Sequence, residues 1–187
     1  MYGTSQGYGT GISTIGEYQL VPFLLRKIRK NKWSTENLSW INSGELQADC
    51  LGDMGTKDNK LSVYRISDDK SNLNRVAAAL AATCDNISNF DYLLFNEDLL
   101  QIIGIKSEKT EGNTSDESVN SSHIDLVEIS LSKLVNLANI ASKDGERARI
   151  LQQDIKFFLV ESFRNGYINR KIVKLKSAEI EKIEKLV

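Results

Sequence analysis

The sequence predicts an α+β protein: a mainly helical single domain with a small two- or three-stranded sheet and a C-terminal antiparallel helix hairpin. Three observations favour this class. Apolar residues recur at spacings of three and four along most of the chain, as they do on the buried face of a helix. Only a few segments have the β-branched and aromatic composition of a strand. Proline occurs once, at Pro22, as expected for a helix-rich body.

The chain length and composition suit one domain with a tail and a polar loop. The chain has 187 residues, 41% of them hydrophobic, which is enough for a substantial core. Residues 1–16 are rich in Gly, Ser, Thr and Tyr, so we expect a flexible tail before a globular domain at 17–187. Within that domain the segment 106–122 is polar, with Val119 as its only hydrophobic residue. Such a composition predicts a flexible loop.

The first two thirds of the chain predict short helices and two strands. Pro22 fits only in the first turn of a helix, so the basic segment "LVPFLLRKIRKNKW" is predicted to be a helix that begins near Leu20 or Val21. Trp40 is expected to anchor the loop that follows. Each further helix carries an apolar stripe, and each strand is a short apolar run between turn residues. The further helices are predicted at 44–55, 73–84 and 96–104, and the strands at 61–66 and 90–95.

The last third of the chain is predicted to be helical. Ser122 and Asp125 have the spacing of a capping box, which predicts a helix over 123–142. The turn-like "SKDG" joins it to a second amphipathic helix, so that 123–164 forms an antiparallel hairpin. "YINRKIVKL" predicts a third strand or an irregular connector, and "SAEIEKIEKLV" predicts a small amphipathic helix.

The charge and cysteine content narrow the class of partner and compartment. Lys and Arg number 24 against 25 Asp and Glu, so only a local patch can attract nucleic acid or acidic lipid. No window has the roughly 18 apolar residues of a membrane-spanning helix, and the N-terminus lacks a signal-peptide pattern. The two cysteines, Cys50 and Cys84, have the pattern of small core residues. We therefore expect a cytoplasmic protein in a reducing compartment.

The strongest local charge feature is the run "RKIRKNK" next to a tryptophan. Clustered cations beside an aromatic ring can bind an acidic protein, an acidic membrane or a phosphate backbone. The ordinary alternative is that these cations complement the end of the helix dipole and keep the surface soluble. We predict a partner-binding site, with a protein partner favoured over nucleic acid. It consists of Arg26, Lys27, Arg29, Lys30, Lys32 and Trp33.

A row of carboxylates is the second candidate site. Glu45, Asp49 and Asp53 are spaced four residues apart, so they would share one face of the predicted helix at 44–55. Oxygen ligands of this kind suit Mg²⁺ or Mn²⁺, and such a site would make the protein a metal-assisted hydrolase. The same spacing also fits the solvated face of an ordinary surface helix. The favoured interpretation therefore has no cofactor, and the metal site is the alternative.

Two further residues each allow a functional and an ordinary interpretation. His123, the only histidine, is either a general base beside Asp125 or an exposed residue in the first turn of its helix. Arg65 shares a strand face with Leu61 and Val63, and it either binds an anionic ligand or reaches water or an acid. No phosphate-loop, dinucleotide, serine-hydrolase or zinc-protease motif is present.

The favoured function is therefore a non-enzymatic interaction or regulatory protein. It would bind its partner through the basic N-terminal helix, the C-terminal amphipathic helix, or both. This prediction depends on the local basic run, the near-zero net charge and the lack of an assembled catalytic set in the sequence. The metal-assisted hydrolase remains the alternative.

Overall fold

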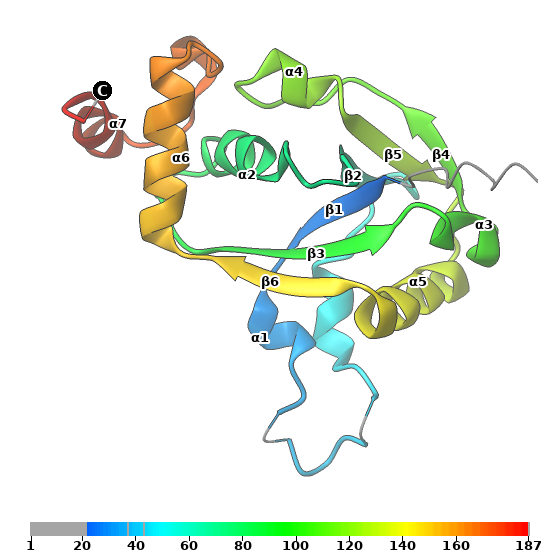
Figure 1. Cartoon of the computed structure of the whole chain (residues 1–187). Helices are drawn as coiled ribbons and strands as arrows, with labels where there is room; N and C mark the ends of the chain where they lie inside the picture. The colour runs from blue at the N-terminus through cyan, green and yellow to red at the C-terminus, as the bar shows by residue number, and fades with distance from the viewer. Residues whose placement is uncertain (1–21, 37, 43, 187) are drawn as a thin grey trace, which may run out of the picture.

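A six-stranded antiparallel sheet forms the centre of the computed structural model, which describes residues 22–36, 38–42 and 44–186 (Figure 1). The strand order is β4-β5-β2-β1-β3-β6, and every neighbouring pair is antiparallel. Strand β1 lies in the middle and pairs with both β2 and β3. The strands are β1 (Phe23–Ile28), β2 (Leu61–Ile66), β3 (Phe90–Asn96), β4 (Lys106–Lys109), β5 (His123–Val127) and β6 (Glu146–Ile150).

Helices cover both faces of the sheet and produce three layers (Figure 1). The first face carries α2 (Leu73–Ala81), α4 (Glu117–Asn120), α6 (Gln152–Arg164) and α7 (Ser177–Glu184), with the short 3₁₀ helix η2 (Arg170–Ile172) between the last two. The second face carries α1 (Lys30–Trp33), η1 (Ala48–Gly52), α3 (Leu99–Ile103) and α5 (Leu131–Asp144).

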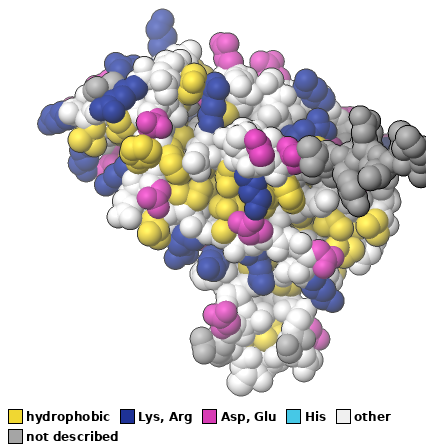
Figure 2. All heavy atoms as spheres, viewed as in Figure 1, with side chains coloured by type: hydrophobic (Ala, Val, Ile, Leu, Met, Phe, Trp, Pro, Cys, Tyr) yellow, Lys and Arg dark blue, Asp and Glu magenta, His cyan; other side chains and the backbone are white. Residues whose placement is uncertain are grey.

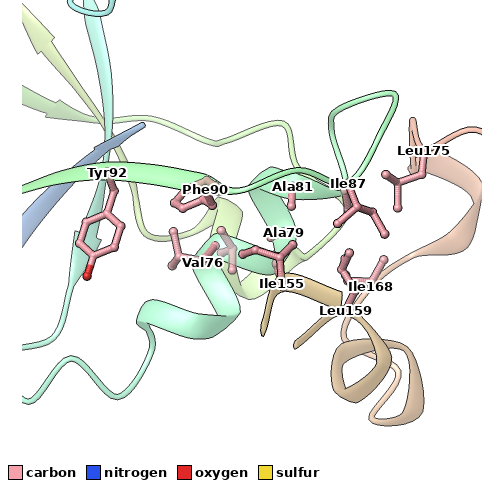
Figure 3. Packing of buried hydrophobic residues seen from close by; sticks show 14 of the residues in the cluster. Val76, Ala79, Ala81, Ile87, Phe90, Tyr92, Ile155, Leu159, Ile168 and Leu175 are labelled. Carbon is pink, nitrogen blue, oxygen red and sulfur yellow. The ribbon is translucent and has the colours of Figure 1, made fainter. Parts of the chain in front are cut away.

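Each face has its own apolar core. Alternate residues of a strand point to opposite faces, so Leu24 belongs to one core and Leu25 to the other, although both are fully buried. In the first core, helix residues such as Val76, Ile155 and Leu159 pack on Phe90 of β3 (Figure 3). The second core contains Leu24, Ile28, Trp33, Met54, Leu93, Phe95 and Leu137.

The predicted fold class, a mainly helical domain with a two- or three-stranded sheet, is wrong, because the sheet has six strands. The strands at 61–66 and 90–95, the helix within 73–84 and the C-terminal helix are confirmed. The predicted N-terminal helix is instead β1. A central strand is buried on both faces, so "FLLRKI" shows no clean alternation, and its apolar spacing resembled a helical stripe.

The predicted helix hairpin at 123–164 is also wrong. Its first part is β5, α5 extends to Asp144 through most of the predicted turn, and β6 occupies the start of the predicted second helix. The two helices that remain, α5 and α6, contribute to different cores and so lie on opposite faces of the sheet. The chain crosses from one face to the other through the edge strand β6.

The polar segment 106–122, predicted to be a flexible loop, contains β4 and α4. Thr114, Ser115 and Asp116 between them are almost fully buried. Hydrogen bonds within the segment hold it in place: the Asn120 side chain accepts from the Thr114 amide at 2.7 Å and donates to the Thr114 carbonyl at 3.1 Å. The predicted tail at 1–16 lies outside the described residues. Nowhere in the described ranges is a helix both long and apolar enough to span a bilayer.

Candidate functional site

The residues of the predicted basic site do not share one face. Arg26 and Lys27 are neighbours on β1 and so point to opposite faces of the sheet, while Lys30 and Lys32 lie on the short helix α1. Arg29 connects the two elements. The predicted basic N-terminal helix is therefore wrong, and each cation has its own environment.

Arg26 holds the backbone of a neighbouring segment. Its Nε donates to the carbonyl oxygen of Asp53 at 2.8 Å, and its Nη1 donates to the carbonyl oxygen of Ser62 at 2.8 Å. Burial lowers the pKa of the Arg26 guanidinium, and the nearby charge of Asp53 opposes this shift. With its donors directed at backbone carbonyls, Arg26 stabilises the chain between η1 and β2 and is not positioned to bind a partner.

Lys27 lies on the other face of β1. Its ammonium is 3.1 Å from the Cys84 sulfur and 5.7 Å from the centre of the Phe90 ring. These contacts place Lys27 at the margin of the first core, away from the cations on α1.

Trp33 is only 1% exposed, so it cannot stack on a nucleotide base. Its indole Nε1 donates to Asp53 Oδ2 at 3.1 Å, and the backbone N–H of Arg29 donates to the same oxygen at 2.7 Å. The ammonium of Lys32 is 3.9 Å from Asp53 Oδ1. Asp53 therefore joins the end of β1, helix α1 and the segment after η1.

The predicted carboxylate row does not form a helix face. The 3₁₀ helix η1 covers only Ala48–Gly52, so Glu45 precedes it and Asp53 follows it. Glu45 accepts hydrogen bonds from the backbone and side-chain nitrogens of Asn42 at 3.1 and 3.2 Å, whereas Asp49 is exposed on η1. Within the described residues, no group of three or more His, Cys, Asp or Glu is placed to hold a metal ion. The predicted helix at 44–55, which would have placed the three carboxylates on one face, is wrong.

Two cations meet at a hollow between α1 and the edge strand β6. The hollow has a volume of about 340 Å³ and is lined by Lys30, Ser34, Thr35, Glu36 and Arg147. Arg147 donates to the backbone carbonyl of Trp33 through Nη1. In the described part of the chain, neither Lys30 nor Arg147 forms an ion pair with a carboxylate. Two positive charges thus line the hollow against the single negative charge of Glu36.

Asp91 fixes the position of Lys30 beside this hollow. One Asp91 oxygen accepts from Arg149 Nε at 2.6 Å, and the other accepts from the Lys30 backbone N–H at 2.9 Å and from Arg149 Nη2 at 3.0 Å. Burial raises the pKa of Asp91, but these hydrogen bonds and the charges of Arg149 and Lys30 outweigh it and leave the pKa below its usual value. Asp91 therefore stays ionised and ties α1 to β3 and β6.

The loop after α1, described at 34–36, 38–42 and 44–47, projects from the body of the molecule beside this hollow (Figure 1). Ser34 and Thr35, which line the hollow, are the first residues of the loop. The Gln47 side chain closes its base by donating to the carbonyls of Ser34 and Asn31. Trp40, which was expected to anchor this loop, is instead 72% exposed. Figure 2 shows Lys and Arg side chains gathered over α1 and β6, just above the projecting loop.

We call the residues that line this hollow, Lys30, Ser34, Thr35, Glu36 and Arg147, the Lys30–Arg147 surface. Of these residues, the sequence pattern identified only Lys30 as a candidate. Arg147 was missed because only the pairing of β6 with β3 brings it beside α1. Arg29, Lys30 and Lys32 remain on the surface near the hollow, but Trp33 and Arg26 belong to the interior network around Asp53.

The C-terminal helix, the second predicted binding element, has its apolar side covered. Ile183 of α7 is 2% exposed and belongs to the first core, where α7 packs against α6. The helix is thus confirmed, but its apolar residues within the described range stabilise the fold.

His123 lies on strand β5, not at the start of a helix. Its Nδ1 is 2.8 Å from the Thr110 hydroxyl, its Nε2 is 3.8 Å from Asp125 Oδ1, and its ring packs edge-on against Tyr64 at 5.1 Å. The expected proximity to Asp125 is confirmed. His123 is 8% exposed. Asp125 also accepts from the Ser62 hydroxyl at 3.0 Å, so the cluster links β5 to β2 and to Thr110, which directly follows β4.

Arg65 forms the ion pair that was one of its two predicted environments. Its Nη2 and Nε donate to the two carboxylate oxygens of Glu97 at 2.6 and 3.1 Å. This bidentate pair links the ends of β2 and β3. Arg65 is thus engaged by an acid of the protein itself.

Comparisons with family models, with curated proteins and with solved structures found no significant match to this chain. The functional argument therefore depends on the geometry of the chain itself. Of the positions described above, the Lys30–Arg147 surface is the one where two exposed cations line one hollow without an ion pair in the described part of the chain.

Proposed function

We propose that the protein is a non-enzymatic interaction or regulatory protein that binds an acidic segment of a protein partner at the Lys30–Arg147 surface. One observation carries this proposal: Lys30 and Arg147, which form no ion pair in the described residues, line one hollow at the base of a projecting loop. Trp40 on that loop is 72% exposed. The free thiols of Cys50 and Cys84 support the reducing, cytoplasmic compartment that we propose with it.

The composition of the surface supports a binding role. Trp and Arg are enriched among the residues that contribute most to binding energy, because each buries a large area and forms directed hydrogen bonds. Arg147 keeps donors beyond the one directed at the Trp33 carbonyl, and a planar guanidinium can bind a carboxylate with two of them. Lys30 adds a second positive charge across the hollow. Acidic side chains of a partner would match this pair.

A protein partner fits this surface better than a nucleic acid. A phosphate backbone presents many regularly spaced charges, and affinity grows with the number of phosphates neutralised. The hollow offers two cations against the one carboxylate of Glu36, which suits one or two acidic side chains better than a long run of phosphates. Trp33 is buried, so Trp40 is the tryptophan ring that this region exposes. A short acidic peptide with an apolar residue to cover Trp40 meets these features with fewer unfavourable contacts.

The test is binding to an array of short peptides in which acidic and apolar residues are varied. The wild type is expected to select peptides with paired acidic residues. The double variant Lys30→Glu/Arg147→Glu should weaken that binding roughly tenfold or more, because it places like charges against the peptide. Trp40→Ala should also weaken it, since it removes the exposed ring.

The matched control is Lys171→Glu/Lys185→Glu, which changes the net charge equally at two exposed lysines elsewhere on the chain. This control is expected to bind as the wild type does. Equal losses in the two double variants would attribute binding to net charge and overturn the proposed surface. A preference for single-stranded oligonucleotides, with a steep loss of affinity as salt rises, would replace the protein partner by a nucleic acid.

A further inference from the structure

A hollow of about 360 Å³ lies between helices α2 and α6. Both helices belong to the first face of the sheet, whereas α1, which carries Lys30, lies on the second face. We call it the Phe157–Glu161 hollow. The residues of its wall that matter below are Asn74, Arg75, Phe157, Phe158, Glu161 and Tyr167.

Aromatic rings are exposed at this hollow. Phe157 is 57% exposed and Tyr167 is 44% exposed. Phe157 and Phe158 pack edge to face with their ring centres 6.0 Å apart, so they form one aromatic surface. Figure 2 shows apolar side chains gathered over α6, with acidic side chains beside them. Grouped apolar side chains that are exposed to solvent are typical of a surface that binds a partner.

The charge of the hollow is negative. Arg75 is the one Lys or Arg among the described residues of its wall, and its Nε and Nη2 donate to the two carboxylate oxygens of Asp116 at 2.6 and 2.9 Å. This pair is neutral as a whole. Glu161 is exposed and forms no ion pair in the described part of the chain. Asp154, one helical turn before Phe158, adds a second unpaired acid to the same side of α6.

The cations of α6 interact with the region of α7 instead. The Arg164 guanidinium donates to the carbonyl oxygen of Leu186, two residues beyond α7. The hydrogen bond from Lys182 lowers the pKa of Glu179 on α7, and the charge of Lys156 adds to this shift. Neither cation of α6 therefore neutralises the two acids beside the hollow.

Charge and shape together favour a cationic side chain as the occupant. An ammonium or guanidinium group is attracted both by a carboxylate and by the face of an aromatic ring. The aliphatic stem of a lysine or arginine can cover Phe157 while its charged end reaches Glu161. Arg75 already makes such a contact at the margin of the hollow, because its guanidinium lies 3.8 Å from the centre of the Tyr167 ring. The unpaired acids would repel the phosphates of a nucleic acid or an acidic lipid.

We propose that the Phe157–Glu161 hollow binds a lysine or arginine side chain in a basic segment of a protein partner. The charged end of that side chain would pair with Glu161, and its stem would lie against Phe157. Asn74 would accept a further hydrogen bond from it. This site selects the opposite charge from the Lys30–Arg147 surface, so its test does not depend on that surface.

The test is amide-resolved NMR titration of the whole chain with short peptides in which Lys or Arg alternates with apolar residues. Matched peptides carry acetyl-lysine or citrulline, which keep the length of the side chain and remove its charge. The basic peptides are expected to shift the amides of residues 71–75 and 157–167. The neutral peptides should bind roughly fivefold more weakly or less well still, because they lose both the ion pair and the cation–π contact. Affinity should fall as salt rises, since Glu161 is exposed.

Variants at exposed positions, which should all fold, keep the result decisive. Glu161→Lys should weaken binding about tenfold, because it replaces attraction by repulsion. Phe157→Ala should weaken it about threefold through the loss of the ring. The matched control Asp49→Lys makes the same change of charge on η1, at the other face of the sheet, and should bind as the wild type does.

Three results would overturn the proposal: no shifts at the hollow with any basic peptide, equal binding of the neutral peptides, or equal losses in Glu161→Lys and Asp49→Lys. Spermidine that binds as tightly as the peptides would also overturn it, because the ligand would then be a small polyamine and not a protein segment.

Discussion

Asp53 shows how a side chain with the pattern of a metal ligand serves a structural purpose. Its carboxylate accepts from the indole of Trp33 and from the Arg29 N–H, and its backbone carbonyl accepts from Arg26. Three elements meet at this one residue. Asp49, which has the same spacing to its neighbours in the sequence, is exposed.

The substitution Asp53→Ala is expected to destabilise the protein by about 2–4 kcal/mol, because it leaves two donors without their acceptor in a largely buried place. Asp49→Ala, in contrast, should change the stability by about 0.5 kcal/mol or less. Urea unfolding of both variants measures the difference through the transition midpoints. Equal effects at the two positions would show that Asp53 has no special structural role.

At the scale of elements, hydrogen-bonded acids attach β6 to the sheet. Asp91 of β3 binds Arg149 of β6, and Glu146 of β6 accepts from Lys70 and from the Tyr92 hydroxyl. The hydrogen bond from Lys70 is the main reason that the pKa of Glu146 lies below its usual value. Burial raises the pKa of the Tyr92 hydroxyl to about 12, and the neighbouring Glu146 adds to this. The edge strand that carries Arg147 is thus fixed by polar contacts on both sides.

These contacts predict an acid-sensitive stability. The pKa of Asp91 is lower in the folded state than in the unfolded chain, where it is about 3.9. Its contribution to stability is therefore complete above that unfolded value and is lost as the pH falls through the folded pKa. Asp91→Asn should flatten the fall in the free energy of unfolding between about pH 5 and pH 2. Urea midpoints across this range measure it, with the exposed Asp85→Asn as control; parallel curves for wild type and Asp91→Asn would contradict the expectation.

The elements that sequence reasoning recovered are those with a local signature. Helix α2 has a regular apolar stripe, and β2 alternates between turn residues. The segments of β1, β5 and β6 were predicted to be helical or turn-like. Whether they form strands depends on pairing with residues far along the chain, as Tyr64 pairs with His123. The same reason explains which residues of the site were predicted. Lys30 was predicted because it belongs to a basic run of the sequence, whereas Arg147 comes to lie beside α1 only because β6 pairs with β3.

At the scale of the whole molecule, the sheet separates the two cysteines. Cys50 belongs to the second core and is 2% exposed, while Cys84 lies beside Lys27 at the margin of the first core. Burial and the nearby charges of Asp53 and Asp49 raise the pKa of the Cys50 thiol. The two thiols therefore differ in access to solvent, and they cannot meet while the sheet is intact.

Brief alkylation of the native protein is expected to modify Cys84 well before Cys50, because the thiolate is the reactive form and Cys50 is protected from solvent. In urea both thiols should react at similar rates. Mass spectrometry of the digested protein gives the extent of modification at each position. Equal rates in the native protein, or a disulfide between the two cysteines, would contradict the placement of the two cores.

The binding role of the Lys30–Arg147 surface is tested most directly by site-specific photo-cross-linking in the native cellular context. A photoreactive residue replaces Trp40 in one chain and the similarly exposed but distant Ile172 in another. We predict that position 40 alone cross-links to an acidic segment of one protein, and that Lys30→Glu/Arg147→Glu abolishes this product. Equal cross-linking from both positions, or a product that persists after charge reversal, would contradict the proposed function.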